Sequence, residues 1–325
     1  MITAIVPVWN GRDLLNRLLD TLDAQTLRAE ELLVVDNGST DGAPELALRR
    51  GARVIAMGRN QGFAAAVNRG IREARGDRLA ILNSDVELAP DYFAILAATD
   101  AWFATGKILQ PGGTSIDGTF DAICRGGTAW RVGSGRPDGP MFSSPCTIAS
   151  PPWTAALFRA ELFQRIGYLD ESFESYLEDV DFGLRCAAHK LTGRYIPAAV
   201  AWHRGSATLG RWHPDTVRRI ARNQLLLVAR HYPGRLLLRY GWPIAVAQLL
   251  WGAVALRHGA GLAWMRGKWE GLRRFSGARS DSSFINSELP GHLRANEEII
   301  RGIQKASGFD WYWRLYFLLT GGGKN

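Results

Sequence analysis

The segment "ITAIVPVWNGRDLLNRLLDTLDAQTLRAEELLVVDNGSTDG" (residues 2–42) decides the fold. Residues 2–8 and residues 31–36 are short runs rich in β-branched and other apolar side chains, and turn-forming residues follow each run. Between the two runs, leucines recur at helical spacing over residues 13–25. A strand, an amphipathic helix and a second strand in this order predict a βαβ unit with parallel strands.

The same alternation continues for about one hundred residues. Residues 52–57 and 77–83 have the character of strands, and residues 62–76 between them have the character of a helix. A further helix is expected over residues 90–104, with Pro90 as its first residue. We therefore predict an α/β fold whose Rossmann-like, mostly parallel sheet is flanked by helices.

Polar side chains stand where three of the predicted strands end, which is the edge at which such sheets bind ligands. Asn10 follows the first strand, and Asp36 ends the second, where it could accept a hydrogen bond from a nucleobase. "LNSDVEL" (82–88) presents Asn83 and Asp85 at the tip of another strand, where a carboxylate can hold a hard divalent cation. Ordinary turn and helix-capping roles remain the alternatives for these residues.

Two further segments carry weaker signals. "AWHRGSAT" (201–208) contains a lone histidine, His203, which the predicted last strand over residues 193–205 carries. A lone histidine is more often structural than a ligand, unless it completes a metal site with Asp85. "GRNQGFAAAVNRGI" (58–71) brings small residues into the start of a helix, which permits either close approach to a phosphate or sugar, or simple close packing.

The stretch "SYLEDVDFGLR" (175–185) sets three carboxylates among apolar residues. Carboxylates are seldom buried without partners, because removing a charge from water is costly. If a helix begins here, Asp181 lies in its first turn, where the helix dipole favours an acid, and Arg185 lies four residues further on. We therefore assign Asp181 to structure and leave Asp179 and Glu178 as the chemical candidates.

Charge and tryptophan are distributed unevenly along the 325 residues, whose net charge is +8. Residues 204–280 hold 14 Lys and Arg against 2 Asp and Glu, and eight of the twelve tryptophans follow residue 201. We place a domain boundary near residue 205 and expect a helical, basic, Trp-rich region over residues 206–325. Its longest apolar run is shorter than the roughly 20 residues that a membrane span needs. A helix lying on an anionic membrane surface, or an ordinary helical subdomain that packs on the core or forms a homodimer, is expected instead.

Other features restrict the class of protein. The three cysteines are far apart, which disfavours a disulfide framework or a zinc site and is consistent with a reducing cytosol. The N-terminal residues resemble a strand rather than a signal peptide. Residues 111–150 are rich in Gly, Pro and Ser, which predicts loops or short hairpins that could act as a lid.

Six motifs occur together in an informative order: "PVWN", "VVDNGSTDG", "NQGFAAAVNRG", "LNSDVEL", "YLEDVDFGLR" and "WHRGSAT". Over residues 2–208 they resemble the family 2 inverting glycosyltransferases of GT-A fold, particularly the bacterial rhamnosyltransferase-like branch that builds cell-surface polysaccharide. The resemblance implies a GT-A catalytic domain over residues 1–205, a nucleotide-diphosphate sugar donor, and Mg²⁺ or Mn²⁺. It favours dTDP-L-rhamnose, with UDP-hexoses as the alternative, and a polysaccharide or polyprenyl-diphosphate-linked glycan as the acceptor.

The resemblance also implies roles for particular positions. Asp179 matches the catalytic base of the family's "ED" motif, and Asp85 and His203 match the metal shell. We expect the donor and its nucleoside at Pro7, Trp9, Asn10, Asp36, Asn60, Asn68, Asn83 and Asp85. Acceptor contacts are expected from Trp153 and Thr154, with Glu178 orienting the acceptor. One departure is that Asn83 replaces the first acid of the DxD-type motif, which leaves Asp85 as the only carboxylate at that strand tip.

Rival functions explain fewer of these residues. A sugar nucleotidyltransferase should carry a glycine-rich, basic phosphate loop after its first strand, and "PVWNGRD" is not such a loop. A glycoside hydrolase could use paired carboxylates but has no need of Asp36 or of an Asp85–His203 pair. The basic tail lacks a recognised nucleic-acid motif, so no nucleic acid is expected as a partner. We expect a cytoplasmic enzyme that is peripheral on the inner face of the cell membrane.

Overall fold

A ten-stranded sheet lies at the centre of the structure, a computed structural model that describes residues 1–205, 210, 212–280 and 288–321. In chain order its strands are β1 (Ile2–Val8), β2 (Glu31–Asp36), β3 (Arg53–Ala56), β4 (Arg78–Leu82), β5 (Val86–Leu88), β6 (Phe103–Leu109), β7 (Ile116–Gly118), β10 (Cys146–Ile148), β11 (Ala155–Arg159) and β12 (Gly193–His203). Across the sheet the order is β10-β12-β6-β11-β4-β1-β2-β3, with β5 beside β12 and β7 beside β6.

The long strands of this sheet point in one direction. β1 is parallel to both β2 and β4, β2 is parallel to β3, and β6 is parallel to β12. β11 runs antiparallel between β4 and β6, so the strands on its two sides share their direction. The mostly parallel sheet predicted from the sequence is confirmed, and the polar ends of β1, β2 and β4 meet at one edge.

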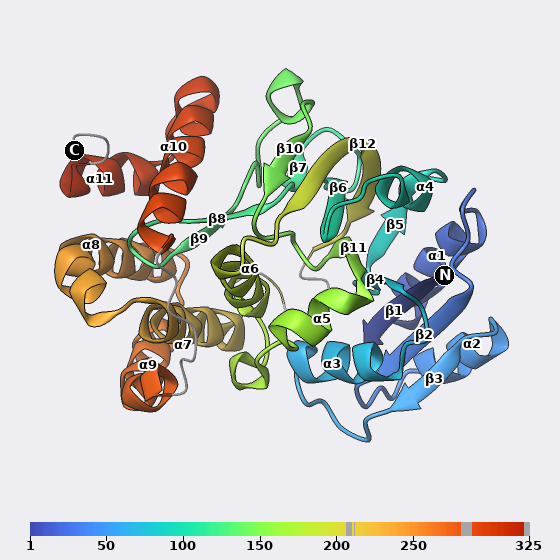
Figure 1. The fold of residues 1–325 in the computed structure, drawn as a ribbon. Coiled ribbons are helices and arrows are strands. Elements are labelled where there is room, and N and C mark those ends of the chain that lie inside the picture. The colour runs from blue at the N-terminus through green and yellow to red at the C-terminus, as the bar shows by residue number, and fades with distance from the viewer. Residues whose placement is uncertain (206–209, 211, 281–287, 322–325) are drawn as a thin grey trace.

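Helices cover both faces of the sheet (Figure 1). The helices are α1 (Arg12–Asp23), α2 (Ala43–Arg49), α3 (Phe63–Glu73), α4 (Tyr92–Ala97), α5 (Ala160–Ile166) and α6 (Glu178–Ala188). Buried side chains of α1, α2 and α4 form one core with alternate residues of β1, and those of α3, α5 and α6 form the other. The leucines of α1 therefore face one core, and successive residues of β1 point alternately into the two cores, as their spacing in the sequence predicts.

One expectation about local structure is wrong, and the loops and short hairpins expected over residues 111–150 are confirmed. The helix expected over residues 90–104 ends at Ala97, because the following Phe103–Leu109 becomes a wholly buried strand between β11 and β12. Within residues 111–150 the chain forms β7, β10, a 3₁₀ turn (Pro140–Phe142) and a separate hairpin of β8 (Asp121–Ile123) and β9 (Ala129–Arg131). Burial between neighbouring strands overrides the local helical pattern in the first case.

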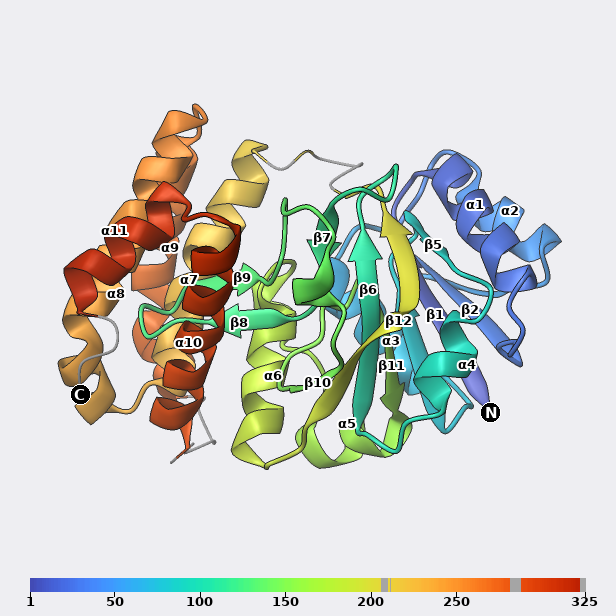
Figure 2. The same ribbon diagram turned by 90° about the horizontal axis from the view of Figure 1, so that it is seen from above.

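Five helices in the described residues follow the sheet: α7 (Pro214–His231), α8 (Gly234–Arg257), α9 (Gly261–Ser280), α10 (Leu289–Ser307) and α11 (Trp311–Thr320). They gather at the end of the molecule opposite α1 and α2 (Figure 2). They share a core with the α/β part, since Leu226 and Leu227 of α7 pack with Phe173 and with Val180 of α6. The helical region expected after residue 205 is present; its boundary as a domain stays a prediction.

Crossing a bilayer requires a long and continuously apolar helix. None of the helices in the described ranges combines the necessary length and hydrophobicity.

Candidate active site

The first two strand ends form a pocket rim of interlocked turns. Val8 at the end of β1 lies in register with Asp36 at the end of β2. Asp36 Oδ1 accepts a hydrogen bond from the Ser39 amide (2.9 Å), and Asn10 Oδ1 accepts one from the Thr40 amide (2.9 Å). The structure therefore brings Asn10 and Asp36 together, and Pro7 and Trp9, both half-buried, flank them on the same strand end.

Two of the other asparagines expected near the donor, Asn60 and Asn68, make hydrogen bonds within the protein, and Asn60 is also exposed and lines a cavity. Asn60 Oδ1 accepts hydrogen bonds from the Gly62 amide (2.9 Å) and from the side chain of Asn37 (3.2 Å), which holds the turn into α3. Asn68 is buried, and its side chain donates to the Leu169 carbonyl (2.8 Å) and accepts from the Leu169 amide (2.9 Å). Asn68 thus anchors the chain ahead of α6, with no surface left for a donor.

The N-terminus of α3 is also occupied by the protein itself. The amides of Phe63 and Ala64 donate to Ser175 Oγ (3.2 Å) and to the Glu174 carbonyl (3.0 Å). The expectation that this helix start is open to a phosphate or sugar is therefore wrong for those two amides. The small residues there allow the chain around residue 174 to approach, because a Cβ on Gly62 would lie 2.7 Å from the Glu174 oxygen.

A histidine and two carboxylates meet at the next strand end. His203 Nε2 lies 3.1 Å from Asp85 Oδ1, and His203 Nδ1 lies 2.9 Å from Asp117 Oδ2. The pairing of β12 with β5 sets this geometry, since His203 is in register with Val86. Burial alone lowers the pKa of His203, but hydrogen bonds to Asp117 and Asp85 outweigh it and raise the pKa to about 9.

These side chains could supply only part of a metal shell. Nε2 of His203 and a carboxylate oxygen of Asp85 are adjacent, and Asp117 holds the other ring nitrogen, as carboxylates commonly do for metal-binding histidines. Across the described residues, however, no three His, Cys, Asp or Glu side chains are arranged as a ready-made metal site. The donor set suits a hard divalent ion only when diphosphate and water oxygens complete its coordination.

The expected acceptor pair Trp153 and Thr154 separates into two roles. Thr154 lies next to the metal-side tip, because its carbonyl accepts a hydrogen bond from the Asn83 amide (2.8 Å). Trp153 is 2% exposed and packs in the core, with its ring centroid 4.8 Å from that of Phe158 and 5.1 Å from that of Phe182. Trp153 is therefore a core residue rather than an acceptor contact.

An arginine that the sequence did not single out joins the two halves of the site. Arg131, at the end of β9, donates to Thr154 Oγ1 (3.2 Å) and places Nη2 3.3 Å from Asp179 Oδ2. Its Nε lies 3.5 Å from Asp121 Oδ1. One arginine among glycine-rich turns gives no recognisable pattern, and the only signal was its closeness to a predicted hairpin.

Three buried carboxylates share this single guanidinium. Burial raises the pKa of Glu178 and of Asp179, with the charge of Arg131 opposing it, and raises the pKa of Asp121 to about 7. Among the described side chains, Asp121 Oδ2 and Glu178 Oε2 are buried without a hydrogen-bond partner. Unmatched carboxylates with raised pKa values can accept protons or bind hydroxyl groups, which is the behaviour of a catalytic site.

The third acid of α6 is fully partnered. Asp181 Oδ2 lies 2.9 Å from Nε of Arg185, and its Oδ1 lies 2.8 Å from Nε2 of His231 on α7. Burial disfavours its charge, yet Arg185 and His231 together lower the pKa of Asp181. The expected pairing with Arg185 is confirmed, and Asp181 serves to join α6 to α7.

The chain is similar to known glycosyltransferases. The family model described as "Glycosyl transferase family 2" matches residues 3–167. N-acetylglucosaminyl-diphospho-decaprenol L-rhamnosyltransferase of Mycobacterium tuberculosis is 28% identical over 272 residues, which are 75% of this chain and 87% of that protein. Succinoglycan biosynthesis protein ExoO of Rhizobium meliloti is 37% identical over 177 residues, which are 53% of this chain and 47% of that protein.

Solved structures share the fold at low sequence identity. GalNAc-T7 with UDP, GalNAc and Mn²⁺ superimposes with a TM-score of 0.62 and 15% identity, covering 95% of this chain and 58% of that one. Mannosyltransferase PcManGT from Pyrobaculum calidifontis, with GDP-Man and Mn²⁺, gives a TM-score of 0.53 and 17% identity, covering 100% of this chain and 88% of that one. The GT-A fold expected from the sequence is confirmed.

Proposed function

The chain belongs to glycosyl transferase family 2 and is a glycosyltransferase, and from this premise we propose an inverting enzyme that transfers L-rhamnose from dTDP-rhamnose to a lipid-linked glycan. The likeness to the decaprenol-linked rhamnosyltransferase, over most of both chains, supports this choice of donor and acceptor. A UDP-hexose donor is the alternative, because Asp36 and its neighbours would hold either nucleoside.

The observation that carries the mechanism is the position of Arg131. Through Thr154 and Asp179 it joins the acidic start of α6 to the strand tip that bears Asn83 and Asp85. An inverting transferase needs a base on the side of the sugar opposite the leaving group, and these two clusters provide the two sides.

Asp179 is the proposed base. Its carboxylate takes the proton from an acceptor hydroxyl while that oxygen forms a bond to the anomeric carbon of the donor sugar. The bond from the same carbon to the diphosphate oxygen breaks, and the electron pair leaves with the nucleoside diphosphate. Burial favours proton uptake by Asp179, and Arg131 keeps enough negative charge on it for the step to begin. Glu178 orients the acceptor through its unpartnered oxygen.

A divalent cation, Mg²⁺ or Mn²⁺, completes the proposal. Asp85 and His203 would hold it, and Asp117 keeps the ring of His203 in place. When bound, such an ion neutralises the negative charge that develops on a departing diphosphate. Two solved structures of this fold contain Mn²⁺, which supports the assignment of the ion.

The C-terminal helices are proposed to bring the enzyme to its acceptor, as a peripheral protein on the cytoplasmic face of the membrane. Three helices expose large apolar side chains at spacings of three, four or seven residues, which place them on one face of each helix. These residues are Leu238, Trp242, Leu249 and Leu256 on α8; Leu262, Met265, Trp269 and Leu272 on α9; and Leu315 and Leu318 on α11. Contiguous exposed apolar surface usually marks a contact site. We call these residues the apolar face.

The charge around the apolar face favours an anionic bilayer. Exposed arginines border it: Arg235, Arg239, Arg257, Arg266, Arg273 and Arg274. Glu270 is the single acid of α8 and α9, and it pairs with Arg218 (2.8 Å). Trp242 Nε1 donates to the Leu319 carbonyl (2.9 Å), which joins the exposed parts of α8 and α11. Apolar and aromatic side chains bordered by cations suit the headgroup layer of an anionic membrane. They suit contact with a second copy of this chain less well, because two such basic faces would repel each other.

The test is a panel of nucleotide sugars with Mn²⁺ and a short-chain GlcNAc-diphosphoryl-lipid acceptor. Transfer from dTDP-rhamnose, with inversion and with loss of activity in Asp179→Asn, is the expected result. Transfer from a UDP-hexose alone would correct the donor. Cleavage of a glycan without any nucleotide sugar would instead indicate a hydrolase and contradict the proposal.

A further inference from the structure

Three of the four residues that precede the acidic helix have an uncommon backbone conformation. Glu174, Tyr176 and Leu177 have positive φ angles of 61°, 73° and 69°. Such conformations are strained for a non-glycine residue and persist only where the surroundings hold them. Leu177 is also the N-cap of α6, so the helix that carries Asp179 begins directly from this segment.

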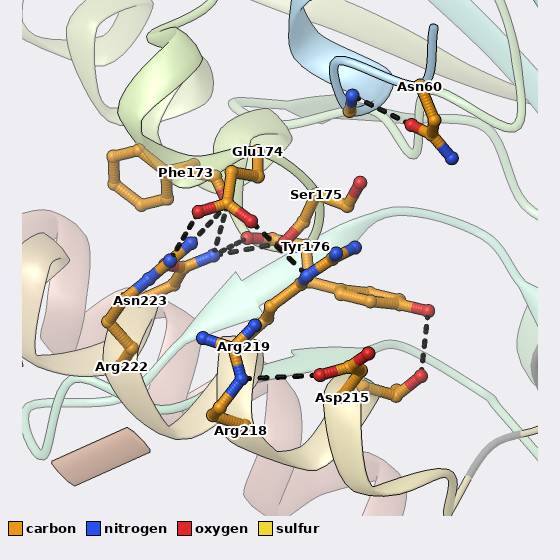
Figure 3. Close-up of polar contacts among 12 residues, drawn as sticks. Asn60, Phe173, Glu174, Ser175, Tyr176, Asp215, Arg218, Arg219, Arg222 and Asn223 are labelled. Carbon is orange, nitrogen blue, oxygen red and sulfur yellow. Dashed lines mark hydrogen bonds and ion pairs between the residues drawn. The ribbon is translucent and has the colours of Figure 1, made fainter. Parts of the chain in front are cut away.

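Two neighbouring residues of α7 hold this segment from one side (Figure 3). The Asn223 amide group lies within hydrogen-bonding distance of the carbonyls of Phe173 (2.9 Å), Ser175 (3.0 Å) and Tyr176 (2.7 Å). Arg222 donates to the Phe173 carbonyl (2.8 Å) and to the carboxylate of Glu174 (2.6 Å). Both side chains are fully buried.

Apart from Arg222 and Asn223, the segment contacts the start of α3, Tyr176 Oη lies 3.2 Å from Thr216 Oγ1 of α7, and Leu177 packs against the core that includes Leu226 and Leu227. The amides of Phe63 and Ala64 bond to Ser175 and Glu174, as described above. Glu174 otherwise borders a cavity of about 470 Å³, which it lines together with Arg219 of α7 and residues 59–62. With a cavity beside Glu174 instead of packed side chains, the buried hydrogen bonds from Arg222 and Asn223 restrain the segment at Phe173, Ser175 and Tyr176.

We propose that Arg222 and Asn223 are positioning residues that set where Asp179 lies. This rests on the proposed role of Asp179 as the base. Asp179 is the second residue of α6, and its contact with Arg131 is 3.3 Å long, so any shift of the helix start moves the carboxylate away from Arg131 and Thr154. A displacement of about 1 Å in a reacting group can lower a rate about 100-fold.

The chain offers matched variants for this inference. Asn223→Asp keeps the side-chain shape and the acceptor oxygen that binds Nε of Arg222 (2.9 Å). It replaces the amide donor to the three carbonyls with a second carboxylate oxygen that repels them, and the new charge lies beside Arg222. Gln224→Ala, one position along the same helix, removes a buried acceptor for Lys268 (2.9 Å) that does not touch the segment. Comparing these two variants distinguishes the effect of releasing the segment before α6 from the effect of losing any buried hydrogen bond of α7.

The experiment measures kcat, donor KM and hydrogen exchange of peptides spanning residues 173–182, at a temperature where every variant is fully folded by circular dichroism. In Asn223→Asp, kcat should fall about 10- to 100-fold with donor KM within about threefold of wild type, and exchange over the segment should accelerate. Gln224→Ala should keep both kcat and the slow exchange.

Two results would overturn the inference: unchanged exchange in Asn223→Asp, or a kcat within twofold of wild type although exchange accelerates. Equal loss of kcat in Gln224→Ala at full folding would show a merely structural role and would overturn it as well. A wild-type protein that transfers no sugar from any donor, yet protects the segment from exchange until Asn223 is changed, would contradict the proposed function and leave the restraint itself standing.

Discussion

Two regions of the molecule depart in opposite ways from the usual rule that apolar side chains are buried and charged ones exposed. One is the edge of the sheet around Asp179, and the other is the apolar face of α8, α9 and α11. At the sheet edge, carboxylates are buried and two of their oxygens lack partners. On the apolar face, large apolar side chains are exposed, up to 88% for Leu238. Both arrangements cost stability in the isolated protein, which is why each is expected to gain a partner: a reacting hydroxyl in one region, a membrane in the other.

Asp181 lies on α6, as Asp179 does, and provides a comparison within one helix. It is more deeply buried than Asp179 (1% against 9% exposed), but Arg185 and His231 satisfy both of its oxygens. Burial of charge therefore does not by itself mark chemistry. Around Asp179 the unpartnered oxygens belong to Glu178 and Asp121, while Asp179 itself is bonded by Arg131 and the Val180 amide.

The strongest test of the comparison is Asp179→Asn. An amide cannot accept the acceptor proton, so transfer should fall about 10²- to 10⁴-fold, which is the usual contribution of a general base. Donor affinity, measured by calorimetry, should stay near the wild-type value because Asp36 and the metal side are untouched. Substantial residual transfer in this variant would move the base to Glu178 or Asp121.

A smaller loss is expected from Asp117→Asn. The change removes the carboxylate that orients His203 through Nδ1, and such outer partners typically contribute about 10- to 100-fold in metal affinity. The Mn²⁺ concentration for half-maximal transfer should rise by that factor, while activity recovers at saturating Mn²⁺. An unchanged Mn²⁺ titration would show that His203 takes no part in binding the ion.

Arg131→Gln should change the pH profile more than the maximal rate. The charge of Arg131 opposes the raised pKa of Asp179, so its removal raises that pKa further. Because the base works only when deprotonated, the acidic limb of kcat/KM should move to higher pH. Arg131→Lys, which keeps the charge, is the control. A limb that stays in place would exclude Asp179 as the titrating base.

The least effect on chemistry is expected from the double change Trp242→Ser and Leu249→Ser on the apolar face. Flotation with vesicles that contain phosphatidylglycerol should be lost, while transfer to a soluble, short-chain acceptor stays within about twofold of wild type. Wild-type protein should float less well in high salt, since the bordering arginines contribute through charge. A wild-type dimer by light scattering that dissociates in this variant, with no vesicle binding, would make the face a homodimer contact.

Much of the architecture could be read from short-range pattern. β1, α1 and β2 appear where the alternation and leucine spacing put them, because those periods report which side of an element is buried. The meeting of Asp85 with His203 was also predictable, since both follow strand ends at one edge of a parallel sheet. The family resemblance added the choice of Asp179 over its neighbours, which the three acids alone do not reveal.

Other residues needed the tertiary structure. Arg131 and Asp117 come from short strands in a glycine-rich segment, where no period marks which side chains face the site. Trp153 and Asn68 seemed to be ligand contacts, yet the core and the chain before α6 take up their surfaces.

By itself the sequence determined the α/β fold, the change of character after residue 205 and the clustering of polar residues at strand ends, because these depend on local periodicity and composition. Only the tertiary structure decided which of the buried acids have partners and how the strained chain before α6 is held by α7. Those outcomes depend on contacts such as Arg131 with Asp179, 48 residues away, and Asn223 with Tyr176, 47 residues away. Contacts of that separation form only when the whole chain has packed, so no local pattern records them.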